Sequence, residues 1–170
     1  MALRLGGMGV PLNCDKMGSQ DQILKGLQAW AGQFYGADAT VERLIRLSGG
    51  ASQETWSLDV EQGGKVVDLI LRRVPGGVSV ARNSEAIGLG TEAKLLSCAE
   101  GEVPAPRVVQ VFEPDSDIGE AFLMNRIPGQ TIARKILRDD IYSAARGRLT
   151  EQCGQALAAI HQIPPEALPD

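Results

Sequence analysis

The sequence contains one histidine and three cysteines, and this scarcity excludes several kinds of site. With His161 alone, a zinc site built on histidines and a Ser-His-Asp hydrolase that uses several histidines both lose support. Cys14, Cys98 and Cys153 are widely scattered and match no zinc-binding spacing. Because three scattered cysteines do not suit a disulfide framework either, we expect a reducing compartment and a cytoplasmic protein.

Long apolar runs and an excess of basic residues are also lacking. No apolar run approaches the roughly 18 residues that span a bilayer, so we expect no membrane partner. The net charge is −4, whereas a surface that tracks nucleic acid usually shows a basic excess. We therefore expect no nucleic-acid partner, although a local basic patch stays open. The glycine-rich residues 1–18 lack the apolar core of a secretory signal, and we interpret them as a disordered leader.

The hydrophobic pattern predicts an α+β fold. A capping box at Ser19–Gln22, followed by apolar residues at helical spacing, predicts an N-terminal helix that ends near Gly36. Strands are predicted over residues 41–47, 56–60, 65–73, 107–112 and 121–124, and helices over residues 89–99, 131–137 and 149–161. Since Gly63-Gly64 is a hairpin signal, we expect a five-stranded antiparallel sheet with one inserted helix, followed by helices.

The stretch LSGGASQETW joins the first two predicted strands with very little side chain. Gly49, Gly50 and Ala51 would let backbone N–H groups approach an anion closely, and Ser52 would add a hydroxyl donor. A plain hairpin turn explains the same residues. The stretch matches neither G-x-G-x-x-G nor the Walker pattern, so both interpretations stay open on local sequence.

The third predicted strand places a cation beside an apolar residue. In DLILRR, the period of two puts Asp68, Ile70 and Arg72 on one face of the strand. This arrangement suits a nucleotide, with the base against Ile70 and the phosphates against Arg72. The alternative is an arginine that snorkels from a strand end.

The inserted helix carries a carboxylate at the border of its apolar stripe. Glu92 lies three residues after Leu89 and three before Leu95, so it does not sit opposite the stripe. A lone charge there is costly when buried, and Arg72 is its natural partner. We therefore predict an Arg72–Glu92 ion pair; a solvated helix edge is the alternative.

Six motifs follow one another between about Val41 and Pro165: LSGGASQETW, LILRR, TEAKLL, VPAPRVV, FLMNRIPGQTI and LAAIHQIPP. In this order they resemble the N-terminal lobe of the aminoglycoside phosphotransferase family, kinase-like enzymes that phosphorylate small molecules. The branch they resemble most is the kinase part of acyl-CoA dehydrogenase members 10 and 11. The resemblance implies a kinase-like small lobe over residues 19–127 and the start of a helical large lobe over 128–170.

The resemblance also implies roles for particular residues. The loop with Gly49, Gly50, Ala51 and Ser52 is similar to the loop that covers the nucleotide. Arg72 resembles the phosphate-binding lysine, and Glu92 its ion-pair partner. The predicted hinge, whose backbone would bond adenine, consists of Met124, Asn125, Arg126 and Ile127. The implied reaction is transfer of the γ-phosphoryl group of ATP, with Mg²⁺, to the hydroxyl of a small-molecule acceptor.

Two departures from the family pattern limit this expectation. The lysine position holds Arg72, which is a bulkier, forked cation. The catalytic His-Gly-Asp segment and the metal-binding Asp are not found in these 170 residues, and Asp139-Asp140 reads as a solvated charged run. We therefore expect no catalytic or metal-binding residue here, an inactive chain, and an active full-length parent. A non-enzymatic interaction module or homo-oligomer is the competing hypothesis.

Overall fold

The computed structural model describes residues 20–48, 53–77 and 87–168. Its strands are β1 (Thr40–Arg46), β2 (Glu54–Gln62), β3 (Lys65–Arg73), β4 (Val108–Phe112) and β5 (Ala121–Asn125). Its α-helices are α1 (Gln20–Phe34), α2 (Leu89–Cys98), α3 (Ala133–Arg138) and α4 (Ser143–Ile160). Short 3₁₀ turns are η2 (Asp140–Tyr142) and η3 (Pro165–Ala167), whereas the turn η1 (Pro75–Gly77) contains two glycines with positive φ and is not a regular 3₁₀ helix. The predicted Ser19 cap and the leader lie outside the described residues.

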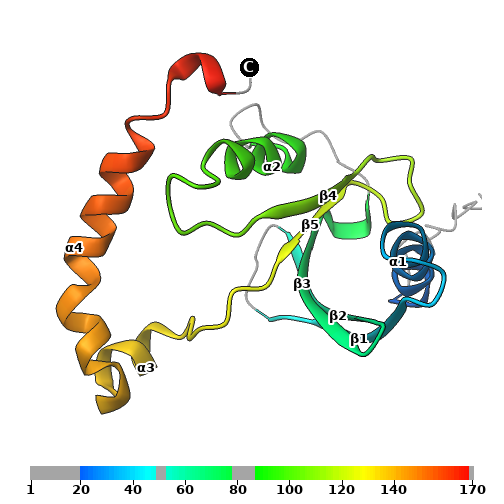
Figure 1. The fold of residues 1–170 in the computed structure, drawn as a ribbon, viewed down its shortest axis with the longest axis horizontal. Helices are drawn as coiled ribbons and strands as arrows, with labels where there is room; N and C mark the ends of the chain where they lie inside the picture. The colour runs from blue at the N-terminus through cyan, green and yellow to red at the C-terminus, as the bar shows by residue number, and fades with distance from the viewer. Residues whose placement is uncertain (1–19, 49–52, 78–86, 169–170) are drawn as a thin grey trace, which may run out of the picture.

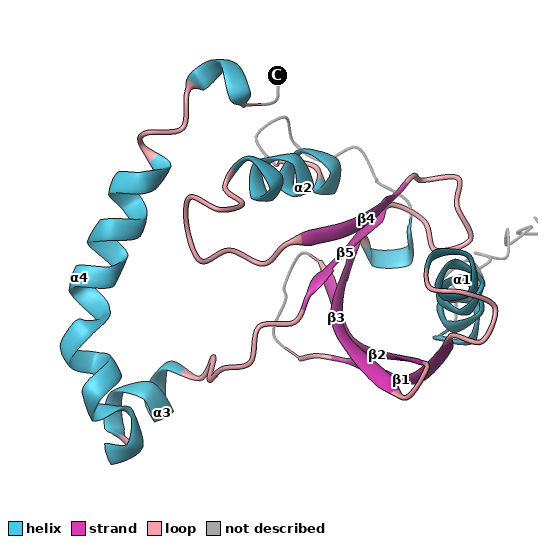
Figure 2. Cartoon of the chain, in the orientation of Figure 1, coloured by secondary structure: helices cyan, strands magenta, loops and turns pink. Residues whose placement is uncertain are grey.

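The strands form one antiparallel sheet in the order β1-β2-β3-β5-β4 (Figures 1 and 2). Gly63 and Gly64 join β2 to β3 with φ angles of 58° and 80°, the left-handed pair that a tight type I′ hairpin requires. The predicted α+β fold, with a five-stranded antiparallel sheet, an N-terminal helix and one inserted helix, is confirmed.

The two faces of the sheet carry different cores. Helix α1 covers one face, where Leu58, Leu71 and Leu123 are fully buried against Ile23 and Leu27. Helix α2 covers the other face, where a smaller cluster is buried: Val74, Leu89, Ala93 and Phe122. Because side chains alternate along β5, Phe122 and Leu123 enter opposite cores.

Helix α4 extends away from the sheet, as Figure 1 shows. The prediction began this helix at residue 149, where its apolar stripe starts, but the helix begins at Ser143. The six residues before Leu149 carry no stripe, yet alanine and arginine among them are strong helix formers. The apolar stripe consists of Leu149, Cys153, Leu157 and Ile160, and all four residues are exposed.

After α4 the chain returns to α2, where the Cys98 thiol donates a hydrogen bond of 2.9 Å to the Ala167 carbonyl. In the described part of the chain, no helix is both long enough and apolar enough to cross a membrane.

Candidate functional site

Arg72 and Glu92 meet between β3 and α2. The Nε atom of Arg72 lies 3.1 Å from Oε1 of Glu92, and Nη2 donates to Oε2 at 3.2 Å. Both side chains are partly exposed, at 29% and 32%. The predicted ion pair is confirmed, and it presents a forked cation at the solvent boundary of the α2 face.

The local sequence explains why the two charges meet. Alternation along β3 points Arg72 to the α2 face, where its register neighbours are Thr55 on β2 and Phe122 on β5. Leu89 and Ala93 bury themselves against the Phe122 cluster, so the first turn of α2 lies over this end of β3. Glu92 lies between Leu89 and Ala93 on α2, and its side chain therefore reaches Arg72.

A row of side chains crosses the sheet one step from Arg72. Strand register places Ile45, Ser57, Ile70 and Met124 side by side on the α2 face. Ile45 is exposed, and the other three are partly buried. Three of the four are apolar and could receive a flat ring, with the Arg72 cation next to it. The predicted platform around Ile70 therefore extends over four strands.

The side chain of Arg126 lies across the same face. Its Nη1 donates to the Ser57 hydroxyl at 2.6 Å and to Asp59 at 2.7 Å, and its Nη2 bonds Asp68. The sequence pattern singled out Arg126 only for its backbone and did not predict this cluster. Asp59 and Asp68 are paired in register, so two carboxylates facing each other were the signal that a cation must lie nearby.

The backbone N–H groups of the predicted hinge differ in whether they donate a hydrogen bond within the protein. The Asn125 N–H bonds the Arg107 carbonyl and the Arg126 N–H bonds the Asp68 carbonyl, each at 3.0 Å. Asn125 also accepts the Arg107 N–H through its side chain. Within residues 20–48, 53–77 and 87–168, the Ile127 N–H has no hydrogen-bond partner. It is therefore the donor that a ligand at this edge would meet.

The predicted phosphate loop, Gly49, Gly50, Ala51 and Ser52, lies outside the described residues. Its flanks are described: the Leu47 N–H donates to the Thr55 carbonyl at 2.8 Å, next to the last register pair between β1 and β2.

A second ion pair, which sequence reasoning missed, lies on the other face of β3. Nη1 of Arg73 lies 2.9 Å from Oε2 of Glu54, and only 4% and 7% of the two side chains are exposed. Nε of Arg73 donates to the Ile118 carbonyl at 2.6 Å. The only sequence signal was the two-residue alternation along β3, which places Arg73 on the same face as the buried residues of that strand.

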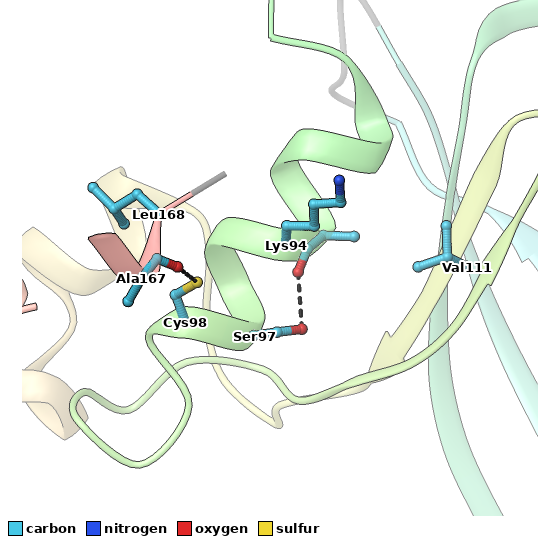
Figure 3. Close-up of a pocket in the computed structure, with 7 residues that line it drawn as sticks. Lys94, Ser97, Cys98, Val111, Ala167 and Leu168 are labelled. Atoms are coloured by element: carbon cyan, nitrogen blue, oxygen red, sulfur yellow. Dashed lines mark hydrogen bonds between the residues drawn. The ribbon is translucent and has the colours of Figure 1, made fainter. Parts of the chain in front are cut away.

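The described residues also form a pocket of about 460 Å³ between α2 and the C-terminal turn (Figure 3). Its lining includes Lys94, Ser97, Cys98, Ala167 and Leu168. Figure 3 shows the hydrogen bond between Cys98 and Ala167, two of its lining residues. Neither Arg72 nor Glu92 lines this pocket, so it is separate from the site above.

The fold and the site define an α+β protein with a cation–carboxylate pair between its third strand and inserted helix. The profile of a family described as "Phosphotransferase enzyme family" matches residues 43–170, and the chain belongs to this family. The match includes Arg72, Glu92 and the predicted hinge, but it does not assign a branch within the family.

Among solved structures, the crystal structure of aminoglycoside phosphotransferase APH(4)-Ia is similar, with a TM-score of 0.48 and 16% sequence identity. The likeness covers 82% of this chain and 40% of that chain, so this chain spans less than half of that protein's length. No curated protein matches the sequence.

Proposed function

We propose that this chain is the nucleotide-binding lobe of an ATP-dependent small-molecule phosphotransferase. The whole protein would transfer the γ-phosphoryl group of ATP to a hydroxyl of a small acceptor. The observation that carries the proposal is the forked contact between Arg72 and Glu92, next to an apolar row. This pairing fixes a guanidinium at the place where nucleotide phosphates would arrive, and family membership supports the same role.

Each part of the site would hold one part of ATP. The adenine ring would lie against Ile45, Ile70 and Met124, and its ring nitrogen would accept the Ile127 N–H. The α- and β-phosphates would lie against the Arg72 guanidinium, which matches phosphate geometry in two parallel hydrogen bonds. Glu92 would keep that guanidinium in place before the ligand arrives, which lowers the ordering cost of binding.

Magnesium would enter with the ATP phosphates. No group of three or more His, Cys, Asp or Glu side chains that could hold a metal occurs within the described parts of the chain, so we assign no metal ligand to it. The 170 residues contain no His-Gly-Asp segment to position an acceptor hydroxyl. We therefore predict that this chain binds ATP and does not turn it over.

The described cysteines, Cys98 and Cys153, are free thiols, which supports a cytoplasmic location.

The test is titration of a fluorescent ATP analogue with Mg²⁺ into the 170-residue chain and into Arg72→Ala. We expect the variant to bind at least about tenfold more weakly, because a charge-assisted hydrogen bond contributes about 1.5–3 kcal/mol. Arg134→Ala, an exposed arginine on α3, is the matched control and should bind as the wild type does. Equal binding by Arg72→Ala would remove Arg72 from the site. Phosphate release by the wild type above Arg72→Ala would contradict the predicted inactivity.

The exposed stripe of α4 favours a second candidate, an interaction module that self-associates. Leu149, Leu157 and Ile160 are 46%, 55% and 46% exposed, and contiguous exposed apolar side chains mark association surfaces. Sedimentation of the wild type and of Leu157→Glu distinguishes the two: a concentration-dependent dimer that the variant abolishes supports the module. A coding sequence that continues past residue 170 into an H-G-D-x-x-x-x-N segment supports the enzyme instead.

A further inference from the structure

We propose that Glu54 and Arg73 are a buried positioning pair that holds Arg72 where it can contact phosphate. This inference rests on the proposed function, because it assigns the pair a role at the same site. We call Glu54, Arg73 and the Ile118 carbonyl the brace.

The brace joins three segments of the chain at one point. The Arg73 guanidinium bonds Glu54 on β2 at 2.9 Å and the Ile118 carbonyl, between β4 and β5, at 2.6 Å. Glu54 and Arg73 are also the register pair at the end of the β2–β3 ladder. A second cation, Arg46 at the end of β1, lies 3.5 Å from the other Glu54 oxygen. The charged end of three neighbouring strands is therefore tied together on the α1 face.

Gly77 lies close against the Arg73 guanidinium, and Gly119 lies close against the Gly77 backbone; we call these two glycines the cage. A Cβ atom on Gly77 would lie 2.4 Å from Nη2 of Arg73, and a Cβ atom on Gly119 would lie 2.4 Å from the Gly77 carbonyl. Both glycines have positive φ, 77° and 81°. The Glu120 N–H closes this cage with a 2.9 Å bond to the Gly77 carbonyl. The guanidinium thus has little room to move, and neither does the strand end that carries it.

The position of Arg72 follows from that of Arg73. The two residues are neighbours on one extended strand, so their side chains leave the same segment of backbone toward opposite faces. Thr55, the register partner of Arg72, is in turn the neighbour of Glu54. A shift or twist of this strand end would therefore move Arg72 away from Glu92, although no atom of the brace lies on the α2 face.

The energetics of buried ion pairs make it possible to test whether the pair positions Arg72 or only stabilises the fold. Replacing a buried pair by apolar residues of similar volume is often neutral or stabilising, whereas removing one partner is strongly destabilising. The double variant Glu54→Leu/Arg73→Met therefore removes the bond to Ile118 and the ion pair while filling their volume. If the brace positions Arg72, this variant should fold and still bind nucleotide poorly.

The experiment compares three chains: wild type, Glu54→Leu/Arg73→Met, and Leu69→Met as a control on the same face of β3. For each we would measure the urea midpoint, the affinity for the fluorescent ATP analogue with Mg²⁺, and the exchange rate of the Arg72 Nε–H by NMR. We expect the double variant to bind about tenfold more weakly than wild type and to exchange the Arg72 Nε–H several-fold faster, with the midpoint maintained. Leu69→Met should match the wild type in all three.

Wild-type affinity and wild-type Arg72 exchange in the folded double variant would overturn the proposal, because the pair would then be structural only. If the wild type itself binds no ATP, the proposed function fails, while Arg72 exchange without ligand still decides whether the brace positions this side chain. If the double variant does not fold, Arg73→Lys replaces it. This variant keeps a charge near Glu54 but loses the hydrogen bond from Nε to the Ile118 carbonyl, so faster Arg72 exchange supports the brace and unchanged exchange overturns it.

Discussion

Arg72 and Arg73 are adjacent residues of the same type on one strand, yet their environments have little in common. The side chain of Arg72 is 29% exposed and pairs with a carboxylate on a helix, whereas that of Arg73 is 4% exposed and pairs with one on a strand. The difference comes from the period of two along β3, which sends neighbours to opposite faces. An arginine at the solvent boundary can exchange its partner for a ligand; a buried arginine with its partners fixed can only support the structure around it.

The largest difference between the two arginines should appear in stability. Arg73→Ala leaves Glu54 buried without its main partner, and we expect a loss of roughly 3–5 kcal/mol in the free energy of unfolding. Arg72→Ala should cost no more than about 1 kcal/mol, because partly exposed pairs contribute little. Urea denaturation of both variants measures the gap. Equal losses would show that burial does not separate the two residues.

The cage around Arg73 gives a prediction of intermediate size. Gly119→Ala combines a left-handed backbone with a contact to the Gly77 backbone, so we expect a loss of roughly 1–3 kcal/mol or more. Gly64 has nearly the same φ, 80° against 81°, but has nothing within 4 Å of an added Cβ. Gly64→Ala is therefore the matched control for backbone strain alone. If urea denaturation shows the same loss of stability for both variants, the contact between Gly119 and the Gly77 backbone contributes nothing beyond backbone strain.

On the α2 face, one substitution should weaken ligand binding while leaving the stability of the fold almost unchanged. Glu92→Gln keeps the shape of the side chain but removes the charge that holds Arg72. We expect a change in the urea midpoint near the limit of detection and a several-fold weaker affinity for the ATP analogue, since Arg72 is then less preorganised. Affinity equal to that of the wild type would mean that Arg72 needs no partner to bind phosphate.

The smallest expected effect is a dependence of stability on alkaline pH. Burial raises the pKa of the Tyr35 phenol above 10.0, and the Arg107 cation offsets part of this rise. The folded state therefore holds this proton more tightly than the unfolded chain, so the stabilisation is complete below pH of about 10 and is lost as pH rises through the folded pKa. Urea midpoints at increasing alkaline pH should fall less for Tyr35→Phe than for wild type, and an equal fall in both chains would contradict this prediction.

Local patterns in the sequence predicted the elements and the Arg72–Glu92 pair. Alternation along β3 and the helical stripe of α2 each depend on neighbours in the chain, and both gave the correct face. The brace was not predictable in this way, because the Ile118 carbonyl lies 45 residues from Arg73 and no local pattern links them. The β2–β3 hairpin did pair Asp59 with Asp68 and so indicated a nearby cation, but Arg126 lies 58 residues from Asp68, and no local pattern identified it as that cation. The roles of the loop at 49–52 and of the hinge stay predictions.

Ile118 belongs to the brace through its carbonyl and to the interface with α1 through its side chain. A Cβ atom on Gly26 of α1 would lie 2.8 Å from Cγ1 of Ile118, so helix and loop are in close contact at this point. A mechanical load applied to α1 would therefore reach the Arg73 guanidinium through one residue. In a single-molecule pulling experiment along this direction, detachment of α1 and rupture of the Arg73 contacts should occur in one step.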